Sequence, residues 1–277
     1  MVQGIVLDEF VVRDIASGFD IQKFIRLVQQ DTTFYKAFKS LRLLRFTMYN
    51  DIEIWTKTQA LKASYSSISQ QERENNCRKM IVKKEQVKGD FYDRKGNYNY
   101  HTAKLYAHLF FTKGVICGDH NIVKGNTFKG STKYEEQLRM LIFNPGQRIS
   151  GIPGIGKNVA IFQSPTFEKY NFTLKCVVYN EEECYVFKAI PKKEEKENVV
   201  INELKTWFRV SDYAIVARDY SLSFKTLLYD FDVAMQVKLK PIQTYLVPYE
   251  IHYRGNWHVF SRPREIATFT SIFTDFE

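Results

Sequence analysis

The chain has 277 residues, 44% of them hydrophobic, so it is long enough to bury a sizeable core in one large domain or two small ones. Its 40 Lys and Arg outnumber its 31 Asp and Glu, which gives a net charge of +9. This charge suits an anionic partner such as nucleic acid or a phospholipid surface. Because no long block of like charges occurs, it also fits an ordinary solvated surface. No apolar stretch approaches the roughly 20 residues that a membrane-spanning helix requires, so the sequence offers no candidate for one.

The chain begins with an apolar segment, residues 5–12 (IVLDEFVV), which predicts a strand. Exported bacterial proteins often begin their mature part with Gln soon after a small-residue cleavage site, and Gln3 stands in such a position. We therefore expect a leader peptide upstream of Gln3 in the reading frame, and an exported protein.

Two amphipathic helices are predicted next. Apolar residues recur at helical spacing over 21–28, with Phe24 among them, and Asp20 is placed to cap the first turn. Residues 31–41 repeat the pattern, with Phe34 and Phe38 on one face. We expect both helices to lie on a sheet.

The next part of the chain predicts strands and then a second helical region. The pattern predicts, in order, a short alternating segment over 44–48, a turn at 50–51 and a long strand over 52–68. A polar turn over 70–76 and a strand over 80–92 follow. Residues 102–112 and 134–143 predict helices, and Phe110 and Phe111 lie at the end of the first. Residues 144–164 are rich in Gly and Pro and predict an irregular segment.

The last third of the chain predicts an antiparallel sheet with one apolar face. Strands are expected from residue 170 onward, five of them over 199–276, and the short turns between them favour antiparallel neighbours. The clearest run is 231–239, in which every second residue is apolar while Asp232, Gln236 and Lys238 point to the other face.

These elements predict an α+β fold: a curved antiparallel β-sheet or half-open β-barrel with helices packed on its concave face. We expect a single domain over 1–277. Its parts are an N-terminal strand or arm (1–19), helices with the first strand group (20–100), a helical and glycine-rich insertion (101–169) and the C-terminal antiparallel sheet (170–277).

The four cysteines, Cys77, Cys117, Cys176 and Cys184, allow three full pairings, and their even number fits an oxidising compartment. A hairpin tip at Glu181 and Glu182 would place the sulfurs of Cys176 and Cys184 on opposite faces, so we expect no bond between them. Because neither a CxxC motif nor a Cys/His cluster occurs, no structural zinc site is expected.

The strongest local motif is the glycine-rich run over 151–158 (GIPGIGKN). It departs from a P-loop because Asn158 stands where magnesium requires Ser or Thr, and Pro165 ends the helix that should follow. The run also resembles the hairpin of a helix-hairpin-helix motif, in which Gly154, Gly156 and Lys157 would hold a DNA phosphate. We favour a glycine-rich crossover loop and keep DNA binding as an alternative.

Catalytic constellations are weak throughout the sequence. No His lies in an HExxH motif, and no GxSxG nucleophile elbow occurs. Asp230 and Asp232 share a strand face, but nothing places a second carboxylate pair opposite them, as a glycosidase would require. We therefore expect a protein that is not an enzyme and holds neither a cofactor nor a metal.

Segments of the C-terminal part resemble a known family. Residues 215–222 (IVARDYSL), 229–233 (YDFDV), 246–251 (LVPYEI) and 253–257 (YRGNW), with 7–12 (LDEFVV), are similar to uncharacterised Bacteroidota envelope proteins. Their C-terminal sheet in turn resembles the outer-membrane lipoprotein carrier (LolA/LppX-like) superfamily, in which a strand ends in a Val-Pro step such as Val247-Pro248. The resemblance implies a half-open barrel with helices as a lid, acyl chains bound inside it, and a location in the periplasm or at the outer membrane.

We therefore expect a non-enzymatic envelope protein that binds a lipid, an acyl chain or a lipoprotein. The lid residues would be Phe24, Phe38, Phe110 and Phe111, and the sheet residues Phe231, Val233, Met235 and Val237. The alternative is an interaction module with a filled core that binds another envelope protein through its surface.

Overall fold

The computed structural model describes residues 5–16, 18–118, 145–146, 155, 158–225, 229–259 and 263–277. The chain divides into two compact units: unit 1 comprises Met1–Lys36 and Thr127–Ser223, and unit 2 comprises Ala37–Asn126 and Phe224–Glu277. The single-domain organisation expected from the sequence stays a prediction.

Unit 1 is an open sheet with helices on one face. Its strands lie in the order β1-β6-β7-β8-β9; β1 is parallel to β6 and the other pairs are antiparallel. The elements are β1 (Ile5–Leu7), α1 (Glu9–Ala16), α2 (Ile21–Gln30), the short 3₁₀ helices η1 (Phe167–Lys169) and η2 (Lys193–Asn198), β6 (Tyr170–Tyr179), β7 (Glu182–Pro191), β8 (Ile201–Arg209) and β9 (Ile215–Lys225).

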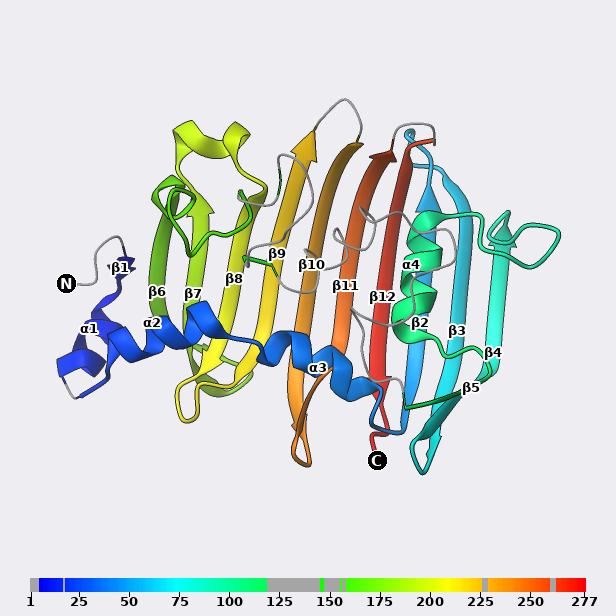
Figure 1. Ribbon diagram of the computed structural model, residues 1–277, viewed down its shortest axis with the longest axis horizontal. Helices are drawn as coiled ribbons and strands as arrows, with labels where there is room; N and C mark the ends of the chain where they lie inside the picture. Colours follow the sequence, from blue (N-terminus) through cyan, green and yellow to red (C-terminus); the bar gives the residue numbers. More distant parts are fainter. Residues whose placement is uncertain are drawn as a thin grey trace. The chain divides into compact units, whose positions relative to one another are not determined.

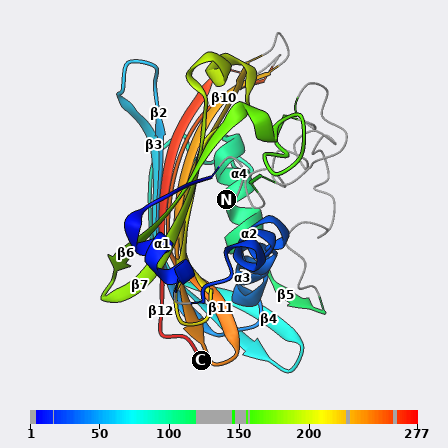
Figure 2. The same ribbon diagram turned by 90° about the vertical axis from the view of Figure 1, so that its left-hand side faces the viewer.

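Unit 2 is an open antiparallel sheet in the order β10-β11-β12-β2-β3-β4-β5. Helix α4 lies on the concave side of its strands (Figures 1 and 2). The elements are α3 (Thr33–Leu41, whose residues from Ala37 belong to this unit), β2 (Phe46–Trp55), β3 (Leu61–Glu74), β4 (Cys77–Gly89), α4 (His101–Phe110), β5 (Val115–Cys117), β10 (Tyr229–Ile242), β11 (Tyr245–Val259) and β12 (Glu265–Thr274).

Strand alternation builds the core of unit 2. Five buried apolar side chains face one another across five neighbouring strands, namely Met235, Tyr253, Phe269, Ile52 and Tyr65. The ring of Tyr106 on α4 lies 5.0 Å from that of Phe269, so the helix covers this row. The predicted antiparallel sheet with one apolar face and helices against it is thus confirmed.

Several predicted elements are confirmed as they stand. Asp20 caps α2 by accepting a hydrogen bond from the backbone N–H of Lys23 at 2.9 Å, and Phe24 and Val28 lie on the buried face of this helix. Helix α4 occupies the position predicted over 102–112, and β8 to β12 are the five strands predicted over 199–276.

Three local predictions were wrong. The strand predicted over 5–12 is present only at 5–7, and residues 9–16 form a helix, which the Asp8 carboxylate caps by accepting from the N–H of Val11 at 3.0 Å. No turn occurs at 50–51: β2 runs through Asn50, which is buried and hydrogen-bonded to Ser67, and the chain turns at 56–60 instead. The polar turn predicted over 70–76 is mostly strand, since β3 continues to Glu74 and only Asn75 takes a positive φ.

The hairpin between β6 and β7 differs by one residue from the prediction. Its tip is Asn180 and Glu181, both with positive φ, because Asn tolerates the left-handed region. Cys176 lies opposite Tyr185 and Cys184 lies opposite Val177, so the two thiols lie on opposite faces and are not bonded to each other, as predicted. The helix predicted over 134–143 and the residues Gly154, Gly156 and Lys157 lie outside the described residues.

Candidate functional site

Most side chains predicted to line a ligand cavity lie in unit 2 and are buried there. On α4 and after it, the Phe110 ring lies 5.9 Å from that of Phe273, and the half-buried Phe111 ring lies 5.4 Å from that of Tyr106. The fully covered members are Phe38, Phe110, Phe231, Val233, Met235 and Val237. That these residues contact a ligand stays a prediction.

The eighth predicted residue, Phe24, belongs to unit 1. It projects from α2 onto the sheet, where its ring lies 5.2 Å from Phe208 and 5.5 Å from Tyr185. The predicted set is therefore divided between the strands of unit 1 and those of unit 2.

Helix α4 is held on its sheet by polar contacts that the sequence analysis missed. The Tyr106 hydroxyl bonds to the buried Asn50 amide oxygen and lies 3.0 Å from Ser271 Oγ. The Glu265 carboxylate of β12 accepts from the first N–H groups of the helix, those of His101 and Thr102, at 2.7 Å each. Burial raises the pKa of Tyr106 well above its usual range, so the hydroxyl is a permanent donor.

A small cavity lies next to the helices in each unit. A cavity of about 10 Å³ lies between Leu109, Phe110, Phe273 and their neighbours in unit 2. Another of about 10 Å³ lies between Val28, Asp31, Phe187 and Arg218 in unit 1. Each has room for about one water molecule, so neither cavity can hold an acyl chain as it stands.

Unit 1 buries an ion pair on its apolar face. One guanidinium nitrogen of Arg218 on β9 lies 3.4 Å from the carboxylate of Asp31, between α2 and α3, and the two side chains are 6% and 5% exposed. The Nε of Arg218 donates to Thr206 Oγ1 at 3.0 Å. The sequence analysis missed Arg218, although the alternation of β9 could have revealed it. Arg218 lies on the same buried face of this strand as Tyr220 and Leu222.

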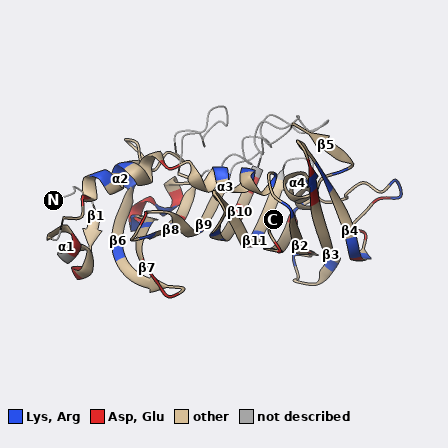
Figure 3. Ribbon diagram, turned by 90° about the horizontal axis from the view of Figure 1, so that it is seen from below, with Lys and Arg blue, Asp and Glu red and all other residues tan. Residues whose placement is uncertain are grey.

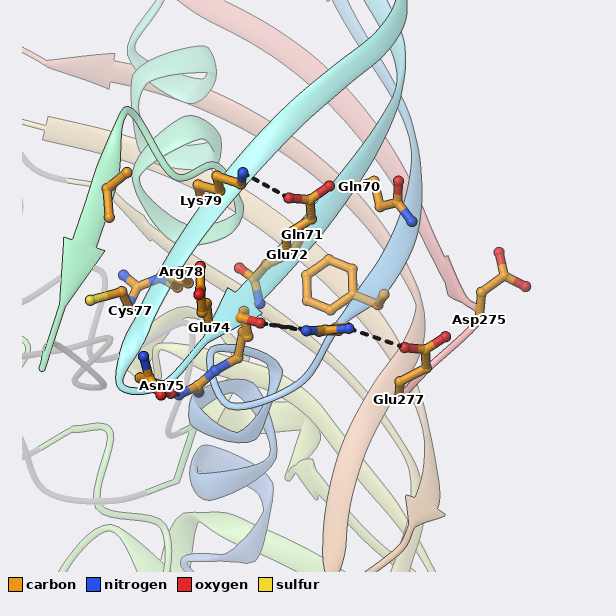
Figure 4. Close-up of a pocket in the computed structure, with 14 residues that line it drawn as sticks. Gln70, Gln71, Glu72, Glu74, Asn75, Cys77, Arg78, Lys79, Asp275 and Glu277 are labelled. Atoms are coloured by element: carbon orange, nitrogen blue, oxygen red, sulfur yellow. Dashed lines mark hydrogen bonds and ion pairs between the residues drawn. The ribbon is translucent and has the colours of Figure 1, made fainter.

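Unit 2 also contains a polar pocket (Figure 4). It measures about 930 Å³ and lies at the end of β2, β3 and β4. Its cations are engaged within the protein: Arg45 donates to the carbonyl of Arg73 at 2.8 Å, and Lys79 lies 2.9 Å from Glu72. Because cations and carboxylates alternate around it, we assign no ligand to this pocket.

The solvent-facing side of the unit 2 strands carries paired charges. Glu250 lies 2.7 Å from His252 Nε2 and 3.0 Å from Lys238 Nζ; partial burial raises its pKa, but these two hydrogen bonds outweigh burial and lower it. Asp230 pairs with Arg264. Within the described ranges, no group of three His, Cys, Asp or Glu side chains is arranged to hold a metal ion, and no helix is long and apolar enough to cross a bilayer.

Comparisons with known proteins identify no family. No family model matches the chain, and no curated protein matches it. Similar solved structures include a DUF1329 family protein from Desulfovibrio piger, with 11% identity over 89% of this chain and 93% of that chain and a TM-score of 0.26.

Two further similar structures are described as a lipoprotein-sorting protein and as a LolA superfamily protein. A putative outer membrane lipoprotein-sorting protein domain from Vibrio parahaemolyticus has 12% identity over 88% of this chain and 90% of that chain, with a TM-score of 0.26. A LolA superfamily protein from Nitrosomonas europaea has 10% identity over 89% and 94%, with a TM-score of 0.22. Both names match the superfamily that the C-terminal segments resemble. The Bacteroidota origin stays a prediction.

Proposed function

We propose that the protein binds a hydrophobic ligand (a lipid, an acyl chain or a lipoprotein) on the apolar face of its sheets, without catalysis. The observation that carries this proposal lies in unit 2, where α4, a helix of 10 residues, lies on a broad apolar sheet face. A short helix joined to the sheet by a few side chains can be lifted more easily than a second sheet.

The apolar contacts that would be lost and gained when an acyl chain displaces α4 are similar in size. The large side chains that α4 buries are Tyr106, Leu109 and Phe110, and removing each from apolar surroundings costs about 1.5–3 kcal/mol. An acyl chain that buries about ten methylene groups on the same face recovers about 8 kcal/mol. The apolar contact that an acyl chain gains on this face thus offsets the apolar contact of α4, while the hydrogen bonds of Tyr106 and Glu265 add to the cost of displacing the helix.

The disulfide supports an extracytoplasmic location. Cys77 of β4 and Cys117 of β5 face each other across the sheet and are bonded. Disulfides persist mainly in oxidising compartments such as the bacterial periplasm, so we propose that the protein acts in the cell envelope.

Lipid extraction tests the proposal directly. Organic extraction of the purified, unheated protein, followed by lipid mass spectrometry, should recover a stoichiometric lipid. Phe110→Ala should bind a fluorescent fatty acid more tightly than the unchanged protein, because less apolar contact has to be displaced. Val178→Ala, at a side chain that is 73% exposed in unit 1, is the matched control and should leave the affinity unchanged. A folded Phe110→Ala protein that binds no better would count against displacement of α4.

The second candidate function is an interaction module with a filled core. The small volume of the two interior spaces, about 10 Å³ each, favours it. It predicts that the unheated protein yields no lipid and that native mass spectrometry shows the mass of the bare chain even after incubation with lipid vesicles.

A further inference from the structure

We propose that Arg218 in unit 1 is an anion-binding residue that takes the carboxylate or phosphate at the polar end of an acyl ligand. This inference rests on the proposed function and adds the chemical class of the ligand, which is an amphiphile with a negatively charged head.

The surroundings of Arg218 are those of an apolar core. Across the sheet it faces Thr206, which in turn faces Phe187. Its guanidinium carbon lies 4.4 Å from the centre of the Phe34 ring. Burial lowers the pKa of Arg218, which reflects the cost of holding a charge away from water. Such a charge is retained only where a partner or a ligand compensates it.

The internal partner compensates Arg218 incompletely. Asp31 offers one oxygen at 3.4 Å, whereas a strong guanidinium–carboxylate pair uses two short parallel hydrogen bonds. The other Asp31 oxygen accepts from the backbone N–H of Thr33 at 2.9 Å and so serves the start of α3. Asp31 is therefore shared between a helix cap and a cation, and a second oxyanion can replace it at Arg218.

Space for a polar atom adjoins the guanidinium. The cavity of about 10 Å³ in unit 1 is lined by Arg218, Asp31 and Thr206 on its polar side. Its remaining walls include Val28, Phe187 and Leu204, which are apolar. An anionic head at Arg218 would thus have apolar side chains next to its tail.

The charge of α2 favours the approach of an anion. This helix contains no acidic residue, and its exposed face carries Lys23 and Arg26 (Figure 3). Cations on the helix that covers Arg218 raise the local concentration of a negatively charged amphiphile.

The experiment compares two ligands that differ only in the head. Hexadecanoic acid and hexadecanol are titrated against the protein loaded with the neutral probe N-phenyl-1-naphthylamine. We expect the acid to bind at least about tenfold more tightly, because a hydrogen bond to a charged group is stronger than one between neutral groups. In Arg218→Met, which keeps the apolar volume, the ratio should fall to about one, whereas Asp31→Asn should raise the ratio because the competing carboxylate is gone.

Controls separate this inference from the proposed function. Arg209→Met removes a cation of the same unit that pairs with Glu182 at the end of β8, and it should leave the ratio unchanged. If Arg218→Met fails to fold, the double variant Arg218→Met/Asp31→Asn leaves no buried charge unpaired and carries the same test. If the unchanged protein binds acid and alcohol equally, the inference is overturned while lipid binding stands; if neither ligand binds, the proposed function fails. If acetate or inorganic phosphate alone displaces the acid completely at equal concentration, Arg218 serves a free anion and the acyl assignment is wrong.

Discussion

At the scale of single residues, two glycines of unit 2 share a backbone conformation and differ in their surroundings. Gly89 at the end of β4 has φ +66°, and a Cβ built on it would lie 2.2 Å from the backbone oxygen of Lys62. Gly96 has φ +76°, and nothing lies within 4 Å of such a Cβ. Substituting each glycine by alanine therefore measures two effects separately. At Gly96 the cost is backbone strain alone, and at Gly89 it is backbone strain plus a steric clash with β3.

Gly96→Ala should cost about 1 kcal/mol of unfolding free energy, because an L-residue is strained at positive φ. Gly89→Ala should cost about 1–3 kcal/mol more, because β3 must move away from β4. Urea unfolding of both variants measures the difference. If both variants lose the same unfolding free energy, β3 can move away from Gly89 at no energetic cost.

At the scale of elements, helix α4 receives its N-terminal cap from another strand. The residue before it, Tyr100, makes no side-chain cap, and the Glu265 carboxylate of β12 accepts from two of the first N–H groups instead. A carboxylate at this end also interacts favourably with the helix dipole. The cap thus links the folding of α4 to the sheet, and a ligand that lifts the helix has to break it.

Glu265→Ala should destabilise α4 by about 1–2 kcal/mol, because two N–H groups lose their acceptor. Glu265→Gln, which keeps one oxygen acceptor, should cost less. Hydrogen exchange of the amides over 103–110 measures the effect locally. Asp20→Ala is the control, since Asp20 caps α2 and its loss should leave exchange in α4 as it was.

At the scale of the whole molecule, the four cysteines divide into one disulfide and two thiols. The Cys77–Cys117 bond closes a separation of 40 residues, and its loss in Cys77→Ser/Cys117→Ser should cost about 4 kcal/mol by the loop-entropy estimate. Burial raises the pKa of the Cys184 thiol to about 11, so this thiol is both covered and protonated at neutral pH.

A thiol reagent at pH ~8 should therefore modify Cys184 only in the unfolded protein, where its pKa returns to about 8.5. In denaturant without a reductant we expect two reactive thiols, and four after reduction. Four reactive thiols before reduction would show that the Cys77–Cys117 disulfide is absent. Cys184→Ser is the matched variant. It should leave one reactive thiol in denaturant before reduction and three after reduction.

The buried tyrosines predict how stability depends on pH. Burial raises the pKa of Tyr65 to about 12 and raises those of Tyr106, Tyr170, Tyr185 and Tyr253 as well. An unfolded tyrosine ionises near pH 10, so the unfolded state loses protons first as the pH rises. The stability contributed by these hydroxyls is complete below pH ~10 and is lost as the pH approaches ~12.

Urea midpoints between pH 8 and 12 should therefore fall above pH ~10, with tyrosinate absorbance appearing together with unfolding. Tyr49→Phe changes a tyrosine that is 43% exposed and should leave this curve unchanged. A midpoint that stays constant up to pH ~12 would contradict the assignment of buried, protonated hydroxyls.

The sequence alone determined the elements whose signal is local and periodic. The alternation of β10 and the helical spacing and Asp20 cap of α2 are read within a few residues of one another. The same holds for the antiparallel pairs of β8 with β9 in unit 1 and of β10, β11 and β12 in unit 2. The apolar side chains on these elements, such as Phe24 and Met235, were assigned to buried faces for the same reason.

Only the tertiary structure decided what joins distant parts of the chain. Asn50 suggests a turn by its type, yet it lies inside β2 because Tyr106, 56 residues away, satisfies its side chain. Arg218 finds its counter-ion 187 residues away in Asp31, and the cap of α4 comes from Glu265. Such contacts leave no periodic pattern, because burial of a polar side chain depends on which partner the fold brings within hydrogen-bonding distance.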